Sequence, residues 1–141
     1  MGAEDTAITL HPIGVVKSPR AEKTDDNWGG VEAEIVLDEG RFAPASLTGL
    51  DSFSHLEVVF YMHRVDPTSI EREARHPRNN PDWPKVGIFT QRAKGRPNRI
   101  GVSRCAIRAV DGTSVTVTGL DAIDGTPVLD LKPYFREFGP R

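Results

Sequence analysis

Apolar and polar residues alternate along much of the chain with the two-residue period of β-strands. In residues 31–37, VEAEIVL, apolar side chains occupy every second position and the acidic Glu32 and Glu34 lie between them. Residues 55–63, HLEVVFYMH, are rich in β-branched and aromatic types, which predicts a strand buried on much of both faces. We expect further strands at residues 8–16, 86–92 and 126–131.

The strongest local signal is a β-hairpin. The segments GVSRCAIRAV and TSVTVTGL flank Asp111–Gly112, a dipeptide that suits two positive φ values in a tight turn. Strict alternation along the first arm predicts one face with Cys105, Ile107 and Ala109 and an opposite face with Arg104 and Arg108.

Together these patterns predict a mainly β protein, a single-domain antiparallel β-barrel with short helices and a long Pro-rich loop. A doubly wound α/β fold would need long helical periods between strands, which the sequence lacks. One short helix is predicted at residues 44–49, because Pro suits the first turn and Gly the end. Residues 64–85, with four prolines, are too long for an ordinary connection, so a site lid, a subunit contact and a tolerated insertion all stay open. Within them, residues 69–75 could form a helical turn or two.

Composition narrows the class of protein. The 141 residues carry a formal charge of −2, which argues against a protein that coats nucleic acid with a basic surface. Any contact with RNA or DNA would have to be made by local basic patches. The apolar stretches are too short to span a bilayer, and the acidic start of the chain does not resemble a signal peptide. We therefore expect one domain over residues 1–141 in a soluble, cytoplasmic protein without membrane contact.

Several chemistries are disfavoured by spacing. The chain contains neither G-x-G-x-x-G nor a Walker A sequence, so nucleotide binding by these phosphate loops is not expected. The four histidines are too far apart for a zinc or iron site, and we predict no metal. Cys105 is the single cysteine, which excludes an intramolecular disulfide, and its place on the core face predicts an inert thiol.

Two stretches carry more polar chemistry than a fold requires. In TQRAKGRPNRIGVS, Pro97 stiffens a loop that can present guanidinium and amide donors to a carboxylate, a phosphate or a base edge. In GLDAIDGTPVLDLKPYF, three aspartates surround a Gly-Thr-Pro turn that a lysine and a tyrosine follow. Taken separately, each is also compatible with a purely structural role, as a solvated connector or as a turn with a surface ion pair.

Taken together, GIFTQRAKGRPNRIG and LDAIDGTPVLDLKPY resemble the TrmO family, also called TsaA-like or YaeB-like. IGVVKSPR and LTGLDSFSHLEVVFYMHRVD agree with this resemblance, which covers residues 13–134. It implies a β-barrel homodimer that binds S-adenosyl-L-methionine near the subunit interface. It also implies methylation of the exocyclic nitrogen of threonylcarbamoyladenosine, next to the anticodon of tRNA.

The resemblance also implies particular residues. Those that match the family's cofactor site are Asp26, Asn27, Trp28, His63, Arg64, Arg92, Asp121, Ala122, Ile123, Asp124, Gly125 and Thr126. Those that match its substrate-contacting and catalytic positions are Arg96, Asn98, Asp124, Lys132 and Tyr134. Which of them acts as general base is left open.

The chain departs from the family pattern in three places. Arg99 stands where a second proline is usual, and Lys94 and Gly95 replace small or apolar residues before the central triplet. The extra C-terminal domain of longer members is not expected, because the chain ends seven residues after Tyr134. Two alternatives therefore remain: a methyltransferase acting on another RNA or a small molecule, and a non-catalytic module that binds S-adenosylmethionine or RNA.

Overall fold

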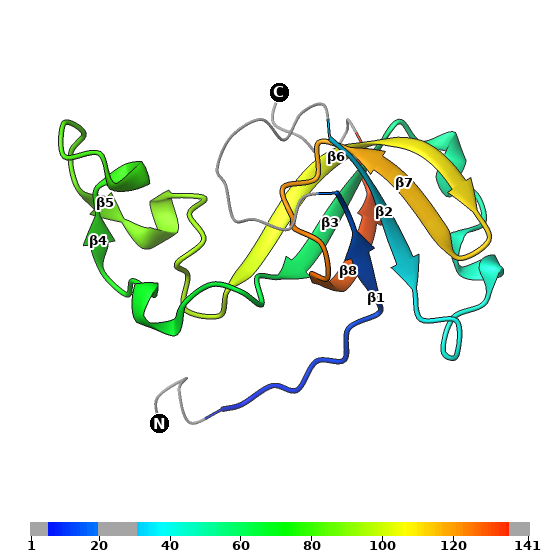
Figure 1. Ribbon diagram of the computed structural model, residues 1–141, viewed down its shortest axis with the longest axis horizontal. Coiled ribbons are helices and arrows are strands. Elements are labelled where there is room, and N and C mark those ends of the chain that lie inside the picture. Colours follow the sequence, from blue (N-terminus) through cyan, green and yellow to red (C-terminus); the bar gives the residue numbers. More distant parts are fainter. Residues whose placement is uncertain (1–5, 20–30, 136–141) are drawn as a thin grey trace.

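The computed structural model describes residues 6–19 and 31–135. Short strands dominate, joined by 3₁₀ turns (Figure 1). The strands are β1 Gly14–Lys17, β2 Glu32–Leu37, β3 His55–Tyr61, β4 Ala74–Arg75, β5 Val86–Gly87, β6 Ile100–Asp111, β7 Ser114–Thr118 and β8 Pro127–Pro133. The 3₁₀ turns are η2 Pro44–Leu47, η3 Leu50–Ser52, η4 Pro67–Ser69, η5 Pro77–Asn79 and η6 Ile88–Thr90.

Six strands of the described chain close into an antiparallel barrel in the order β1-β2-β7-β6-β3-β8. The barrel closes where β1 pairs with β8, with Gly14 opposite Val128. This confirms the predicted fold class. No helix within residues 6–19 and 31–135 is long and apolar enough to cross a membrane.

The barrel interior is filled by the apolar half of each alternating strand. In β2, Ala33, Ile35 and Leu37 point inward, as the sequence pattern predicts. In β3 the inward residues are buried and three of the residues between them are partly buried, so the prediction of a strand buried on much of both faces is confirmed in part. A closed barrel has one interior, and its outer face is covered only where loops cross it.

The predicted hairpin is confirmed as β6–β7, with two differences of detail. Its two-residue loop is Gly112–Thr113, since Asp111 pairs with Ser114. Of the residues in this turn, only Gly112 has a positive φ, of 61°. A β-bulge shifts the register between Ile107 and Ala109, which turns Ala109 outward and corrects its predicted place on the core face.

Other local predictions have mixed outcomes. The helix expected at residues 44–49 is present as the 3₁₀ turn η2, and the strand expected at 126–131 is β8. The strand expected at 8–16 begins only at Gly14. Ile8 and Leu10 are exposed in an extended segment below the barrel in Figure 1.

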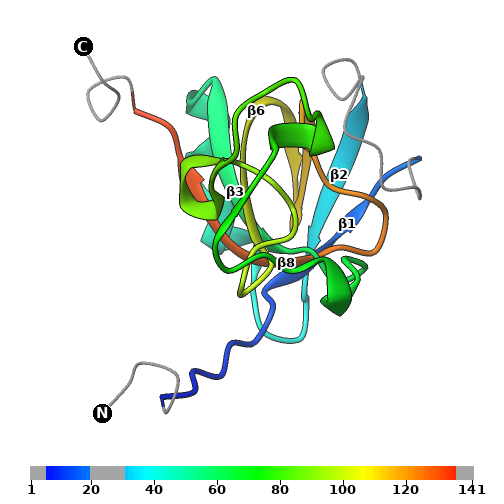
Figure 2. The same ribbon diagram turned by 90° about the vertical axis from the view of Figure 1, so that its left-hand side faces the viewer.

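Residues 66–90 form a lobe that projects from one end of the barrel, and Figure 2 shows it from its own side. The lobe contains the two-stranded sheet β4–β5 and three 3₁₀ turns. The helical turns expected at 69–75 are absent from the described lobe beyond Ser69, where β4 follows instead. The strand expected at 86–92 ends at Gly87 and continues as η6.

Candidate functional site

Three segments that are distant in sequence meet at the end of the barrel that carries the lobe. They are the turn after β3, the loop between β7 and β8, and the segment 91–96 before β6. The topology brings them together, because β3 ends opposite the start of β6, with Tyr61 paired to Ile100. The start of β8 lies beside the same end of β3, with Phe60 paired to Val128.

Between these segments lies a cleft of about 400 Å³. Phe60 and Met62 form its apolar floor, and Arg92, Lys94 and Arg96 line it from the loop side. Among the described residues that line it, Asp121 is the single carboxylate. A concave site with an apolar floor and a few charged groups is typical of small-molecule binding.

A smaller hollow of about 30 Å³ continues the cleft inward and shares Phe60, Met62, Lys94 and Asp121 with it. Six of the residues that sequence resemblance assigned to a cofactor line this hollow: His63, Arg64, Asp121, Ala122, Ile123 and Thr126. The structure therefore brings together two motifs that lie about sixty residues apart in the sequence.

His63 is the most unusual polar group in the hollow. Its Nδ1 atom is buried and has no hydrogen-bond partner within the described chain. Burial, and then the neighbouring Arg64 guanidinium, lower the pKa of His63 from its ordinary value of 6.5. The imidazole is therefore neutral at neutral pH, and its Nδ1 atom is an unused polar group on a side chain that lines the small hollow.

The loop between β7 and β8 is held rigidly against the barrel. Thr126 is buried and its Oγ1 donates to the Ile123 carbonyl at 2.7 Å. The backbone N–H of Gly125 donates to the Val16 carbonyl at 2.8 Å, and its φ of 82° favours glycine. At the other end of the loop, the Asp121 N–H donates to Ser103 Oγ at 3.2 Å.

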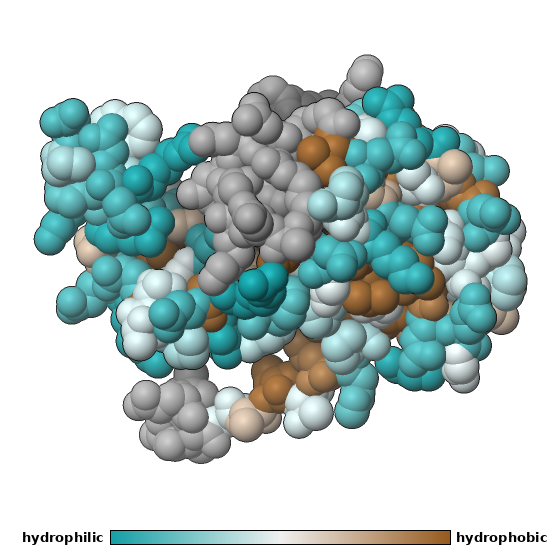
Figure 3. All heavy atoms as spheres, viewed as in Figure 1, coloured by the Kyte–Doolittle hydropathy of each residue, from teal (hydrophilic) through white to brown (hydrophobic). Residues whose placement is uncertain are grey.

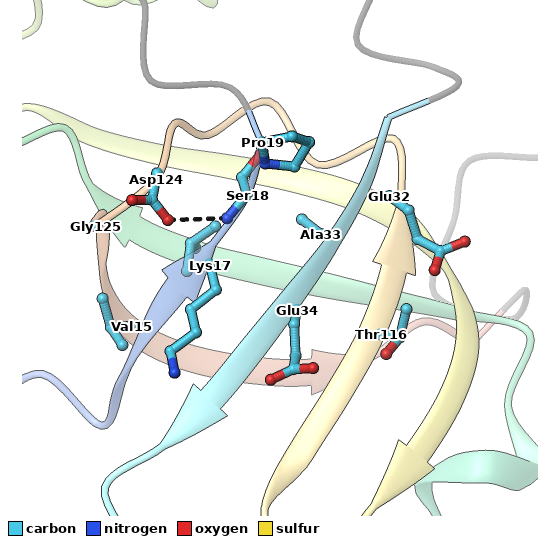
Figure 4. A pocket seen from close by; sticks show the side chains of 11 residues that line it. Val15, Lys17, Ser18, Pro19, Glu32, Ala33, Glu34, Thr116, Asp124 and Gly125 are labelled. Atoms are coloured by element: carbon cyan, nitrogen blue, oxygen red, sulfur yellow. Dashed lines mark hydrogen bonds between the residues drawn. The ribbon is translucent and has the colours of Figure 1, made fainter.

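Asp124 belongs to this loop but faces away from the cleft. Its Oδ1 accepts a hydrogen bond from the Ser18 N–H at 3.0 Å, as the dashed line in Figure 4 shows. Asp124 and Gly125 border a different, open depression between β1 and β2, where Lys17 and Glu34 are register partners. In Figure 4 the Lys17 and Glu34 side chains extend away from Asp124. The Asp124 carboxylate instead accepts from the backbone N–H that follows β1.

The two predicted arginines are tied to the backbone. Arg92 lines the cleft, and its Nη2 donates to the Val102 carbonyl at 2.7 Å. Arg96 is half-buried, and its Nη1 donates to the carbonyls of Gln91, Ala93 and Ile88. Arg96 therefore holds the cleft wall in shape, while Arg92 keeps an exposed guanidinium at the opening.

The remaining predicted residues are not gathered in the cleft. Asn98 lines a separate depression beside Ile100 and the N-terminal segment. Lys132 and Tyr134 lie toward the opposite end of β3, where Lys132 pairs with Glu57 and the Tyr134 N–H donates to the His55 carbonyl. Asp26, Asn27 and Trp28 lie outside the described residues.

Sequence reasoning did not select Phe89, which lines the cleft with 74% of its side chain exposed. The Arg96 guanidinium lies 5.9 Å from the centre of its ring. In the sequence, Phe89 continues the apolar run that begins at Val86 and was interpreted as part of a strand. Nothing in that pattern distinguishes an exposed aromatic from a core residue.

No three His, Cys, Asp or Glu side chains within residues 6–19 and 31–135 gather in a way that could hold a metal ion. The described residues form a small six-stranded barrel, and a cleft of about 400 Å³ lies at the end that carries the lobe. Residues 17–139 match the family model of the tRNA-methyltransferase O N-terminal domain. The chain belongs to this family.

Individual relatives agree with the family match. A tRNA (adenine(37)-N6)-methyltransferase of Mus musculus is 40% identical over 93 residues, which cover 66% of this chain and 21% of the mouse protein. An S-adenosyl-L-methionine-binding protein of Archaeoglobus fulgidus is 33% identical over 130 residues, covering 92% of this chain and 91% of that protein. The crystal structure of TrmO from Pseudomonas aeruginosa has a TM-score of 0.76 and 27% identity, covering 94% of this chain and 58% of that one. The chain thus spans about a fifth of the mouse relative.

Proposed function

We propose that this protein is an S-adenosylmethionine-dependent methyltransferase that modifies an adenine exocyclic nitrogen in tRNA, next to the anticodon. The observation that carries the proposal is the meeting of the 63–64 turn, the 121–126 loop and the basic 92–96 segment at one cleft. The relatives named as tRNA methyltransferases and S-adenosylmethionine-binding proteins support the same activity.

The residues at the cleft fit this cofactor. The donor carries a positive sulfonium, and a neutral His63 avoids the repulsion that a protonated imidazole would cause there. The orphaned Nδ1 atom of His63 offers a hydrogen-bonding group, while Phe60, Met62 and Ile123 provide apolar surface. When bound, S-adenosylmethionine supplies an electrophilic methyl group.

The chain's own residues then have to position the amine and accept its proton. The exocyclic nitrogen of adenine is conjugated and weakly nucleophilic, so alignment of the reacting groups is the main requirement. Asp121 lines both the hollow and the cleft, which makes it the carboxylate best placed to take the proton. Asp124, Lys132 and Tyr134, the earlier candidates for this role, lie elsewhere in the monomer.

Two measurements test the proposal. Calorimetric titration with S-adenosylhomocysteine should show stoichiometric binding, and label from the S-adenosylmethionine methyl group should appear in tRNA. Asp121→Asn should retain cofactor binding and lose most transfer, whereas Asp124→Asn is the matched control on the same loop. Binding without transfer to any RNA would support a non-catalytic module instead, and label at another position would change the substrate.

The finer substrate is threonylcarbamoyladenosine. Its threonyl carboxylate would find Arg92 and Lys94 at the cleft opening, and such charge-assisted contacts are strong. Transfer should therefore be much faster to tRNA that carries the threonylcarbamoyl group than to the same tRNA without it. Equal rates on both would refute this substrate assignment.

The active form is a homodimer in this proposal. Ile8 and Leu10 are 80% and 57% exposed, and they border an apolar depression of about 610 Å³ with Tyr61, Ile100 and Leu129. Figure 3 shows part of this apolar surface below the barrel. A second copy would cover it, since contiguous apolar surface favours association. Light scattering should give twice the 15.5 kDa chain mass, and Ile8→Glu should shift it to the monomer.

A further inference from the structure

We propose that the lobe carries a phosphate-binding cleft for the RNA backbone beside the methyl-transfer site. The cleft has a volume of about 510 Å³ and lies between the lobe and the segment 91–95. Arg75 and Arg78 line it from the lobe, and Arg92 and Lys94 line it from the other side. This inference rests on the proposed function, because it assigns the place where the tRNA strand continues.

The charge and chemistry of the lining favour an anionic, hydrogen-bonding ligand. Apart from these four cations, the polar groups include the amides of Asn79 and Gln91, and Asp121 is the one carboxylate among the described lining residues. A planar guanidinium group can donate two parallel N–H bonds to two oxygens of a phosphodiester. An RNA backbone presents such oxygens at every nucleotide, and a groove lined by cations follows it.

Arg75 has an unused hydrogen-bond donor. Its Nε atom is buried and has no hydrogen-bond partner within residues 6–19 and 31–135. A buried guanidinium N–H without an acceptor is costly, so such groups are rare unless a ligand completes them. Phosphate oxygen is an acceptor of the right kind for this position.

Arg78 is held in an unusual backbone conformation. Arg78 and Asn79 have φ values of 54° and 59°, so two consecutive residues without a glycine occupy the left-handed region. The strained residues lie in the turn Pro77–Asn79, and this backbone conformation places the exposed Arg78 at the edge of the cleft. Strain of this kind is concentrated at binding sites, where the surrounding structure enforces it.

The cleft is continuous with the methyl-transfer site. Both are lined by Arg92, Lys94 and Asp121, together with Thr90, Gln91 and Ala93. The lobe is fixed against this shared wall, because Gln91 Nε2 donates to the carbonyls of Arg75 at 3.2 Å and Val86 at 3.0 Å. A strand with its target base in the first cleft would therefore place flanking phosphates in the second.

The test measures binding of a fluorescent anticodon stem-loop as a function of KCl concentration, with no methyl transfer involved. Arg78→Gln should weaken binding about tenfold at low salt and reduce the slope of log affinity against log salt by about 0.7 to 0.9, the value for one phosphate contact. Arg75→Lys keeps the charge and removes Nε–H, so it should weaken binding while leaving the slope unchanged. Arg108→Gln, an exposed arginine of the β6 bulge, is the matched control.

An unchanged slope in Arg78→Gln, or an equal change in Arg108→Gln, would overturn the proposal. So would absence of stem-loop binding by the wild-type chain, or tighter binding of a DNA duplex of equal length. Cofactor titration of the same variants separates this inference from the proposed function. If S-adenosylhomocysteine binds normally while RNA binding is insensitive to Arg78, the lobe cleft alone is refuted.

Discussion

Replacing Gly95 by Ala tests whether the lobe and the arginine-bearing loop form one rigid wall. A Cβ atom at this buried glycine would lie 2.4 Å from the Ser69 carbonyl oxygen, whereas ordinary contacts begin at 3.4 Å. Ser69 cannot easily retreat, because its N–H and its Oγ both donate to the Asp66 carbonyl, at 2.9 and 2.7 Å. The added methyl must therefore push the lobe and the loop about 1 Å apart.

The expected magnitude follows from two opposing effects. Overpacking of this kind costs about 1 to 3 kcal/mol, while Gly→Ala stabilises by about 0.4 to 1 kcal/mol through the unfolded chain. The net loss of about 1 to 2 kcal/mol falls on the lobe contact and raises local opening about 5- to 30-fold. The barrel core lies elsewhere, so its global unfolding should change less.

Hydrogen exchange provides the assay. The Glu71 N–H donates to the Gly95 carbonyl at 2.8 Å, so its exchange reports directly on this contact. Gly87→Ala is the matched control on the same lobe, because the nearest atom to its Cβ would be 3.9 Å away and its φ is −59°. If Glu71 exchanges at the wild-type rate in Gly95→Ala, or equally fast in Gly87→Ala, the wall is not held by this contact.

Three further predictions concern single side chains. Burial raises the pKa of the Cys105 thiol to about 12, so dithionitrobenzoate at pH 8 should label it only after denaturation, and prompt labelling of the native protein would contradict this. Because the pKa of His63 is lowered in the folded protein, the unfolded chain binds more protons than the folded one below pH 6.5. The free energy of unfolding should therefore fall as the pH falls from 6.5. His63→Gln should flatten this part of a plot of the urea midpoint against pH. Phe89→Ala should leave stability within about 0.5 kcal/mol but weaken stem-loop binding by about 1 to 3 kcal/mol if a base stacks on the ring, and Phe89→Tyr should restore it. Equal loss in both Phe89 variants would exclude stacking.

The barrel could be predicted because its signals are local. Period-two alternation in β2 and the Asp111–Gly112 dipeptide each reflect a backbone geometry that neighbouring residues determine. The bulge at Ile107–Ala109 could not be predicted in this way, since an extra residue in one strand follows from pairing with its partner. The same holds for Gly14, where a Cβ would lie 2.4 Å from the Val36 carbonyl oxygen, a contact that only the β1–β2 pairing creates.

The lobe resisted prediction for a different reason. Its strands β4 and β5 have two residues each, too few to establish a periodic pattern. Its position depends on distant contacts, such as those from Gln91 Nε2 to Arg75 and Val86. Sequence analysis could therefore identify residues 64–85 as an unusual connection but could not choose between a lid, a subunit contact and an insertion.

The 121–126 loop shows why a continuous motif need not form one site. Gly125, with its positive φ, reverses the chain, so neighbouring side chains leave the loop on different sides. Asp121, Ile123 and Thr126 line the hollow beside His63, whereas the Asp124 carboxylate accepts from Ser18 at the end of β1. Both aspartates belong to the same sequence signature, yet only Asp121 reaches the cleft within the monomer. For this reason the two variants Asp121→Asn and Asp124→Asn distinguish loss of proton transfer from loss of loop anchoring. Asp121→Asn should lower the rate of methyl transfer at unchanged cofactor affinity. Asp124→Asn should lower the stability of the β1 end and affect methyl transfer only through that loss of stability.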